Sequence, residues 1–571
     1  MVAKVTTGFL LCIVSFGVAG GSHGNPEGKW KNKVAIERPD ESTTRFKPQP
    51  APDPSKISLV GSSTTITGFW DFQINGGACE MIRVNPANGN IHVIMMVADD
   101  STQQSASRRT AYAMSTDNGT SWNNFSNIRV PDRRSGYPFL DEGRGPIEGA
   151  TIIANHSVVT GSILQSTIFL DFPEGSGSFS EIPPPPLIEP TGADEPVWAA
   201  MACALDGSVT MAPGRLTAAT THVTRTADFV SWSPWMQFPG SDQGSARNVV
   251  ISNGTGRVAV LESALGLNMI ESTNDGASWP STPFVVFPPA FPVGADSFTV
   301  TNGDDAVYDG DNVLVAIEAT GVSTTNDEAQ IIFWSAATGM RVAVPHDTSR
   351  FITTLSHTQT FHSTLGYPVI GMSGTDIVIV FQAFQRDVSP AGFNFSDLWW
   401  TKSTNGGLNW TSPVNLTNTS SVDERYPSIS KWNPPGFANI VWQEKLDPGS
   451  SVRTEDGRPI TRADQKFLRF STATVGVGET AGMPSDYKMS QNYPNPFNPS
   501  TSIDYTVAQA GRVTIKVYDM LGKEVATIVN EAKQSGSYRA TFAGSSLPSG
   551  VYVYQMKSGS YSQSRKMVLL K

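Results

Sequence analysis

The sequence has little positive charge and little charge of any kind. Only 16% of its residues are charged, and 41 Lys and Arg stand against 51 Asp and Glu, which gives a formal net charge of −10. No stretch forms a basic stripe. A chain of this kind has no general electrostatic reason to bind nucleic acid or an anionic membrane, so neither is predicted as a partner.

Long apolar runs are also missing, apart from one at the N-terminus. The stretch MVAKVTTGFLLCIVSFGVAGG holds one lysine, an apolar run from Gly8 to Val18 and then small residues. This order is typical of a secretory signal peptide, predicted at residues 1–21, and the run is too short to span a bilayer. Cys12 lies inside the run, so no lipid anchor is predicted. We expect a soluble mature chain without a transmembrane segment.

Cysteine is scarce. Removal of the signal peptide leaves Cys79 and Cys203, which lie far apart in two apolar, strand-like runs. A disulfide is chemically permitted in an exported protein. Two separate buried thiols are the favoured interpretation, with a disulfide as the alternative.

Motifs for cofactor or metal chemistry are absent. The seven His residues form no HExxH motif and no zinc-type cluster, and His357 with His362 is too weak a pair for a metal site. There is no GxSxG elbow, P-loop or GxGxxG fingerprint. The acidic run NGDDAVYDGDN at 302–312 lacks EF-hand spacing and favours a hairpin turn. The sequence therefore predicts no cofactor and no metal.

Glycine, proline and short apolar runs are abundant instead. The 51 Gly and 39 Pro favour strands and turns over helices, and residues 22–56 are polar and proline-rich, which predicts a disordered tether. From residue 57 to 472 one unit recurs, in which an apolar segment and a second strand flank a Gly, Asn or Asp turn. Seven such pairs begin at Cys79, Pro146, Pro196, Arg247, Ser297, Tyr367 and Tyr426.

Repeated strand pairs of this kind predict an all-β ring. Each unit can bury its faces only against neighbours, so the array has to close on itself as a β-propeller. Seven blades are favoured, with six or eight as alternatives, and residues 58–72 are expected to complete the last blade. A chain of immunoglobulin-like sandwiches is the structural alternative.

One octapeptide occurs three times, as STDNGTSW, STNDGASW and STNGGLNW. An Asp or Asn that accepts backbone N–H bonds, a Gly with positive φ and a packing Trp together suit a tight hairpin turn. The motif resembles the Asp box (BNR repeat), SxDxGxxW, of sialidase-like propellers, with Asn at the Asp position of two copies. We predict a structural role for its residues, which are Ser115, Asp117, Gly119, Trp122, Ser272, Asn274, Gly276, Trp279, Ser403, Asn405, Gly407 and Trp410.

The composition changes again after a linker at 473–487. Residues 488–571 contain strands of clean alternation, such as Val513, Ile515 and Val517, which predict a small C-terminal β-sandwich. The stretches NYPNPFNPS, YDMLGKE, SGVYVY and KMVLLK resemble the type A C-terminal sorting domain of the type IX secretion system of Gram-negative bacteria. The resemblance implies that this domain carries the protein across the outer membrane, with the secretion machinery as its partner. An ordinary terminal sandwich is the alternative.

The Asp-box resemblance also raises a catalytic hypothesis. Sialidases bind the sugar carboxylate with three Arg and use a Tyr nucleophile, a Glu and an Asp acid, and their first Arg lies in an Arg-Ile-Pro strand before the first box. Here IRVNP occupies that place, which makes Arg83 the candidate clamp and Asp99 or Asp100 the candidate acid. The Pro comes one residue late, and Arg247 and Tyr308 are guesses for other roles. A salt-bridge role for Arg83 is the competing interpretation.

The sequence thus predicts a secreted or cell-surface propeller that binds a glycan or a protein. Sialidase-like, exo-acting glycoside hydrolysis is the alternative, and a self-associating surface component is a third class. Thirteen Trp and many Asn/Gly-rich loops suit sugar stacking or protein contact. Three converging Arg on the inner strands would favour the enzyme, and an aromatic, uncharged funnel would favour binding.

Overall fold

The computed structural model describes residues 61–73, 80–160, 163–187, 196–215, 220–241, 248–264, 266–293, 296–321, 329–356, 362–452, 456–473, 487–489, 491–492, 495–507, 511–520, 522–533, 536–559 and 561–570. The predicted signal peptide and tether, Cys79, Arg247, His357 and most of the 473–487 linker lie outside these residues. The part of the chain so described contains no helix with the length and hydropathy of a membrane-spanning segment.

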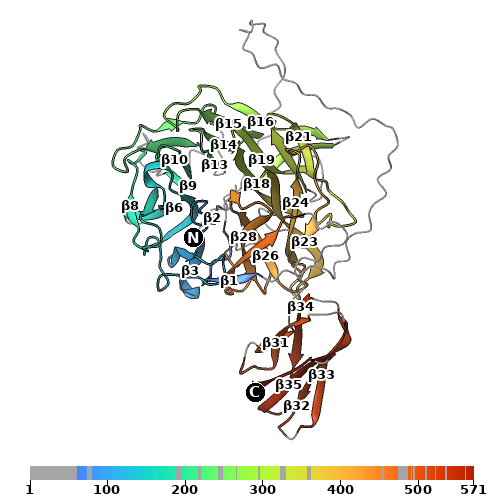
Figure 1. Cartoon of the computed structure of the whole chain (residues 1–571). Coiled ribbons are helices and arrows are strands. Elements are labelled where there is room, and N and C mark those ends of the chain that lie inside the picture. Colours follow the sequence, from blue (N-terminus) through green and yellow to red (C-terminus); the bar gives the residue numbers. More distant parts are fainter. Residues whose placement is uncertain are drawn as a thin grey trace, which may run out of the picture. The chain divides into compact units, whose positions relative to one another are not determined.

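Residues 61–473 form seven small sheets, which Figure 1 shows around a common centre. The first sheet consists of β2 (Ile82–Val84), β3 (Ile91–Ala98) and β4 (Arg108–Ser115). The second consists of β5 (Ser135–Glu142), β6 (Thr151–Thr160), β7 (Ile163–Asp171) and β8 (Ser180–Ile182). The third consists of β9 (Pro196–Cys203), β10 (Val209–Arg215), β11 (His222–Thr226) and β12 (Met236–Gln237). The fourth sheet consists of β13 (Asn248–Ser252), β14 (Val258–Ala264), β15 (Gly266–Ser272) and β16 (Phe284–Phe287). The fifth consists of β17 (Phe291–Val293), β18 (Asp296–Asp309), β19 (Asn312–Gly321), β20 (Ala329–Ser335) and β21 (Gly339–Val344). The sixth sheet consists of β22 (Leu365–Ser373), β23 (Asp376–Val388), β24 (Asn394–Ser403), β25 (Val414–Asn415) and β27 (Trp432–Asn433). The seventh consists of β26 (Asp423–Ile429), β28 (Phe437–Lys445), β29 (Ala463–Ser471) and β1 (Ser62–Gly68). Two short 3-10 turns, η2 (Ser101–Gln103) and η3 (Gly145–Ile147), lie in loops.

The ring closes through the first strand of the chain. β1 is the outermost strand of the last sheet and pairs antiparallel with β29, so that Ser62 lies opposite Phe467. Thr64 Oγ1 donates to Gln465 Oε1 at 2.9 Å, between residues 401 positions apart. The predicted all-β propeller is confirmed, with seven sheets as favoured and with the stretch before the first strand pair completing the last one.

The core lies between neighbouring sheets. All eight residues of β3 and all nine of β22 are buried, because sheets cover both of their faces. The apolar cluster around Ile94 includes Phe169 from the following sheet and Phe467 from the preceding one. A strand that is buried on both faces needs apolar residues at successive positions, which explains the nearly continuous apolar runs in the sequence.

The three octapeptides form the same turn after the third strand of their sheets. In the first copy, Ser115 Oγ donates to Asp117 Oδ1 at 2.8 Å and accepts from Gly119 N at 2.9 Å, while Asp117 Oδ1 accepts from Ser121 N at 2.8 Å. The other two copies repeat these three bonds within 0.2 Å through Ser272 and Asn274 and through Ser403 and Asn405. Asn replaces Asp without loss because only its carbonyl oxygen is needed. The turn leads from the third strand back to the outer edge of the same sheet, since β15 pairs with β16 and β24 pairs with β25.

The glycine of the motif allows close approach to the neighbouring sheet. Gly407 has a φ of +89°, and a Cβ there would lie 2.0 Å from Phe333 Cε1, whereas the adjacent Gly406 has a φ of +69° and no atom within 4 Å. We expect Gly407→Ala to lower the free energy of unfolding by about 2–4 kcal/mol, through backbone strain and the clash with Phe333. Gly406→Ala introduces the backbone strain without the clash and should lower the free energy of unfolding by about 1–2 kcal/mol. Denaturant unfolding of both variants tests this, and equal losses would contradict it.

The C-terminal residues form a separate pair of sheets. One consists of β30 (Lys488–Met489), β31 (Ser500–Val507) and β34 (Gly536–Ala543), the other of β33 (Glu524–Lys533), β32 (Gly511–Tyr518), β35 (Gly550–Ser558) and β36 (Tyr561–Leu569). Val513, Ile515 and Val517 face the buried side together, as their alternation predicts, and meet Ile503 of the other sheet in one apolar cluster. This is the predicted β-sandwich.

Two minor expectations also have an outcome here. Cys203 is a buried free thiol whose pKa burial raises to about 12, which leaves it unreactive, and its relation to Cys79 stays a prediction. The acidic run at 302–312 is the end of β18 and its hairpin to β19, with Asp309 opposite Asn312. Within the described ranges, no group of three or more His, Cys, Asp or Glu is arranged to hold a metal ion.

Candidate functional site

Arg83, the clamp that the sequence suggested, lies in a buried ionic network. Its Nη1 is 2.6 Å from Glu80 Oε2, and its Nε is 3.1 Å from Asp141 Oδ1. Glu80 Oε1 in turn lies 2.7 Å from Lys431 Nζ, which also pairs with Asp305. Burial opposes the ionisation of Glu80, but Arg83 and Lys431 outweigh it and lower the pKa of Glu80 to about 2. The charge of Arg83 is therefore already balanced by protein carboxylates.

The space beside this network is small. Arg83, Tyr308 and Lys431 line a cavity of about 10 Å³ at the centre of the ring, which has room for about one water molecule and not for a sugar. Tyr308 Oη donates to Glu271 Oε1 at 3.0 Å, and burial, together with this carboxylate, raises the pKa of Tyr308. A raised pKa opposes the activation of a tyrosine nucleophile.

The two candidate acids lie elsewhere. In the ladder between β2 and β3, Arg83 lies opposite His92, near the start of β3. Asp99 follows the last residue of β3, so it lies roughly 20 Å from His92 along the strand. Asp99 forms an ion pair with Arg129 at 2.6 Å, and Asp100 Oδ1 accepts from Thr102 N at 2.7 Å in a turn. The structure does not bring Arg83 together with either acid, so their catalytic roles stay predictions without support from this geometry.

A different set of residues stands out at the first strands of four sheets. Tyr137, Trp198, Tyr367 and Tyr426 have φ angles of 49°, 59°, 51° and 54°, and each lies where the pairing of its strand slips by one residue. Positive φ in a bulky residue is strained, and such strain clusters at functional sites. The sequence carries a signal for three of them, because a Tyr-Pro pair begins at Tyr137, Tyr367 and Tyr426. In the sequence, such pairs indicate only the start of a strand, and they do not predict the positive φ angles.

Tyr137 helps to enclose Arg108, the first residue of β4. The Arg108 Cζ lies 5.0 Å from the ring centroid of Trp70 and 5.1 Å from that of Tyr137. In its own plane, Arg108 Nε donates to Ser135 O at 2.9 Å, and Nη2 lies 2.9 Å from His156 Nε2. The guanidinium thus lies within cation–π distance of two aromatic rings.

Among the described residues, no side chain balances the charge of Arg108. It is 5% exposed, and no carboxylate of the described residues lies within ion-pair distance of it. Burial lowers the pKa of Arg108 to about 10, which keeps it protonated at neutral pH. The adjacent Gly136 leaves the necessary room, because a Cβ there would lie 2.6 Å from Arg108 Nε.

His156 and Trp198 complete the site. Burial and the cations Arg108 and Arg134 lower the pKa of His156 well below its usual value, so its ring is neutral at pH 7. The Trp198 amide nitrogen lies 3.4 Å from His156 Nδ1, and Trp198 Nε1 donates to no atom in the described part of the chain. We call Trp70, Arg108, Tyr137, His156 and Trp198 the Arg108 site.

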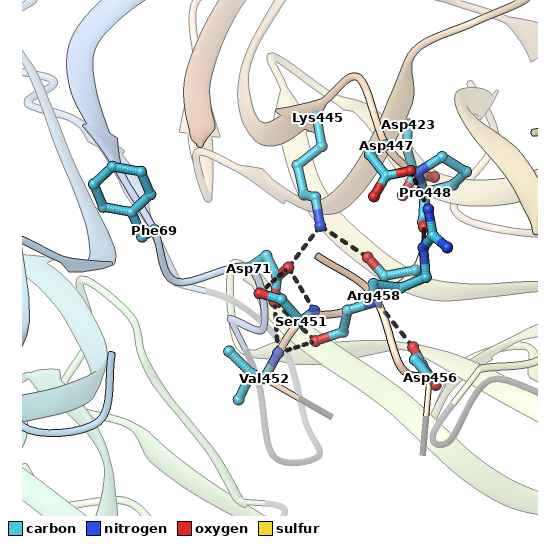
Figure 2. Close-up of polar contacts among 12 residues, drawn as sticks. Phe69, Asp71, Asp423, Lys445, Asp447, Pro448, Ser451, Val452, Asp456 and Arg458 are labelled. Carbon is cyan, nitrogen blue, oxygen red and sulfur yellow. Dashed lines mark hydrogen bonds and ion pairs between the residues drawn. The ribbon is translucent and has the colours of Figure 1, made fainter. Parts of the chain in front are cut away.

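The segment after β1 fixes one wall of this site, and Figure 2 shows its anchor. Asp71 Oδ2 lies 2.6 Å from Lys445 Nζ and accepts from Ser451 N at 2.8 Å, while Asp71 Oδ1 accepts from Ser450 Oγ at 2.8 Å and from Val452 N at 3.3 Å. Trp70 Nε1 donates to the carbonyl of the second residue after it at 2.6 Å. Two neighbouring residues thus position the Trp70 ring against Arg108.

A second buried arginine provides a contrast. Arg425 Nη1 lies 3.3 Å from His362 Nε2, and its Cζ lies 5.1 Å from the Phe384 ring centroid, much as Arg108 meets His156 and aromatic rings. However, Arg425 Nε is 2.6 Å from Asp423 Oδ2. Within the described part of the chain, Arg425 thus has a counter-charge and Arg108 has none.

Comparison with known proteins identifies the C-terminal domain. Residues 491–570 match the family described as "Secretion system C-terminal sorting domain". No curated protein matches the chain. Solved structures similar to it include a protein of unknown function from Dyadobacter fermentans (12% identity, 72% of this chain and 99% of that one, TM-score 0.35), the NanB sialidase from Streptococcus pneumoniae (10%, 72% and 71%, 0.35) and the polysaccharide lyase Uly1 (10%, 75% and 94%, 0.40).

Fold and sorting domain together define the class of this protein. It is an all-β protein in which a propeller is followed by a C-terminal sorting domain. More particularly, it is a secreted or cell-surface β-propeller protein that the type IX secretion system exports, with the secretion machinery as partner of its C-terminal domain.

Proposed function

We propose that the propeller binds an acidic glycan outside a Gram-negative cell and that the Arg108 site holds the anionic group of the sugar. The observation that carries this proposal is the buried guanidinium of Arg108, which has no carboxylate partner in the described residues. An unpaired buried charge costs several kcal/mol, so a position with no need for charge would favour a neutral side chain. A ligand carboxylate or sulfate supplies the missing charge.

The surroundings of Arg108 suit such a ligand. The rings of Trp70 and Tyr137 both lie close to the guanidinium, and those of its N–H groups that do not bond Ser135 O or His156 can donate to the oxygens of a ligand anion. Trp198, whose main-chain N lies 3.4 Å from His156 Nδ1, has an indole N–H without a partner in the described residues. Aromatic rings with a polar edge suit a sugar, which has both apolar C–H faces and hydroxyls.

The export route places this binding outside the cell. The predicted signal peptide (1–21) takes the chain across the inner membrane, the tether (22–56) precedes the propeller (57–472), and the linker (473–487) joins it to the sorting domain (488–571). The Asp boxes are structural turns of the propeller. The product is released or held at the outer cell surface.

The test is calorimetric titration of the full chain with a hyaluronan hexasaccharide, whose only anionic groups are carboxylates. We expect Arg108→Gln to weaken binding by about ten- to hundredfold, because a charged hydrogen bond contributes about 1.5–3 kcal/mol. Arg133→Gln is the matched control, since Arg133 forms an exposed ion pair with Glu181 and should leave affinity unchanged. Unchanged affinity in Arg108→Gln, with a folded protein, would refute the proposal.

Sialidase-like hydrolysis is the competing proposal, and Tyr308 next to Glu271 is the observation that favours it. The same preparation should be assayed with a fluorogenic sialoside. Turnover that disappears in Tyr308→Phe would replace binding with hydrolysis as the function. We expect no turnover, because the cavity at Tyr308 has room for only about one water molecule.

A further inference from the structure

A second cavity lies between the last strand of one sheet and the turn of the next. Its volume is about 310 Å³, at the lower end of the range for small-ligand sites, which is about 300–1,000 Å³. Residues of β21, the segment 345–351 and the segment 408–413 line it. The third octapeptide positions that last segment, because Gly407 packs on Phe333 of β20 and Asn405 Oδ1 accepts from Asn409 N at 3.0 Å.

The cavity has an excess of positive charge. Two cations, Arg341 and Arg350, and one anion, Asp347, line it. Arg350 is held in place, since its Nε lies 3.3 Å from Asp347 Oδ2 and its Nη1 donates to Pro413 O at 3.0 Å. Arg341 donates one bond, from Nη1 to Met340 O at 2.9 Å, and has no ion pair in the described residues. The Arg341 guanidinium is therefore available to an anion.

The rest of the lining suits a sugar ring. Trp410 is half-buried, with its ring 5.1 Å from Phe333 and its Nε1 donating to Gly407 O at 3.2 Å, so the indole is rigidly held. Leu408 is 52% exposed, although it lines the cavity. Asn409 and Thr411 add groups that can bond hydroxyls. An apolar wall with a few polar groups and one free cation is the composition of a small-ligand site.

We propose that this cavity binds one anionic sugar residue of a polysaccharide, with its carboxylate or sulfate on Arg341 and its ring against Trp410 and Leu408. This rim site, defined by these three residues, shares its ligand class with the proposed function but none of its residues. It gives the propeller a second contact for a long acidic chain, and two linked contacts bind more tightly than either alone.

Calorimetric titration of the full chain with three hexasaccharides tests the rim site. Hyaluronan carries only carboxylates, neocarrageenan only sulfates, and cellohexaose no charge. We expect Arg341→Gln to weaken binding of at least one acidic probe by about ten- to hundredfold, because a charge-assisted bond is lost. The probe affected identifies the anionic group as carboxylate or sulfate. Arg512→Gln is the control, since exposed Arg512 of β32 contacts Asn530 of β33 in the C-terminal domain.

Leu408 offers a variant that does not disturb folding, because its side chain is exposed. Leu408→Glu places a carboxylate beside Arg341 and should weaken acidic probes by about tenfold, whereas Leu408→Lys should not weaken them. Cellohexaose should bind more weakly than the acidic probes and be unaffected by Arg341→Gln. Equal affinity of Arg341→Gln and the unchanged protein for both acidic probes would overturn the rim site.

The two sites fail separately in this experiment. If Arg108→Gln removes all acidic binding and Arg341→Gln removes none, the rim site is refuted and the Arg108 site stands. The reverse result refutes the Arg108 site and supports the rim site. If neither acidic probe binds the unchanged protein, both are refuted.

Discussion

Replacing Arg83 with alanine is expected to lower the free energy of unfolding by about 3–5 kcal/mol, because it removes one cation from a buried network of carboxylates. Arg83 is 5% exposed and pairs with Glu80 and Asp141, which are 3% exposed each. Asp141 keeps a bond from Cys203 N at 2.8 Å and the more distant Arg144 at 3.8 Å, and Glu80 keeps Lys431, which it shares with Asp305, so the remaining cations do not replace the close pairs that are lost. Denaturant unfolding followed by tryptophan fluorescence measures the change.

An exposed ion pair is the proper control for this variant. Arg133 and Glu181 are both 36% exposed and 2.5 Å apart, and Arg133→Ala should cost less than about 1 kcal/mol through its ion pair. An Arg83→Ala protein of unchanged stability that loses sialoside turnover would contradict the structural role and restore the clamp that the sequence suggested.

Deleting residues 473–571 is expected to abolish appearance of the protein outside the cell. The sorting domain, matched at 491–570, is the part that export machinery of this kind recognises. Because the propeller closes within residues 61–473 through β1 and β29, the truncated chain should still fold and accumulate in the periplasm. Immunoblots of periplasm, cell surface and medium, in a host with a type IX system, measure this.

Two controls separate a lost signal from a lost fold. Protease resistance of the periplasmic truncation shows that the propeller is intact. Fusion of residues 473–571 to an unrelated periplasmic protein with a signal peptide should carry that protein out of the cell. Normal export of the truncated chain would refute the assignment.

The architecture was predictable because its causes are local. Strand pairs with Gly and Asn turns, and alternation such as Val513, Ile515 and Val517, follow from strand geometry alone. The octapeptides were recognisable because their Ser, Asp or Asn and Gly bond within one turn, as Ser115, Asp117 and Gly119 do. Ring closure was predictable because a repeated unit without closure leaves an apolar face exposed.

The sites were not predictable to the same extent, because they depend on contacts between distant residues. Arg83 had the right neighbours in sequence for a clamp, but its role depends on Asp141 and on the partner that Glu80 finds in Lys431, 351 residues along the chain. For Arg425, by contrast, the counter-charge comes from Asp423, which lies only two residues away in the sequence.

The sequence by itself determined that this is an all-β propeller with a sorting domain, because turn chemistry, alternation and the terminal motifs are properties of short segments. Only the tertiary structure decided which charges remain unbalanced. Arg108 and Arg341 resemble any other arginine in the sequence. Among the described residues, neither has a carboxylate partner, and Arg108 is distinguished by its burial and Arg341 by its place in a cavity. Whether a charge has a partner depends on which strands the closed ring brings together, and no local pattern encodes that.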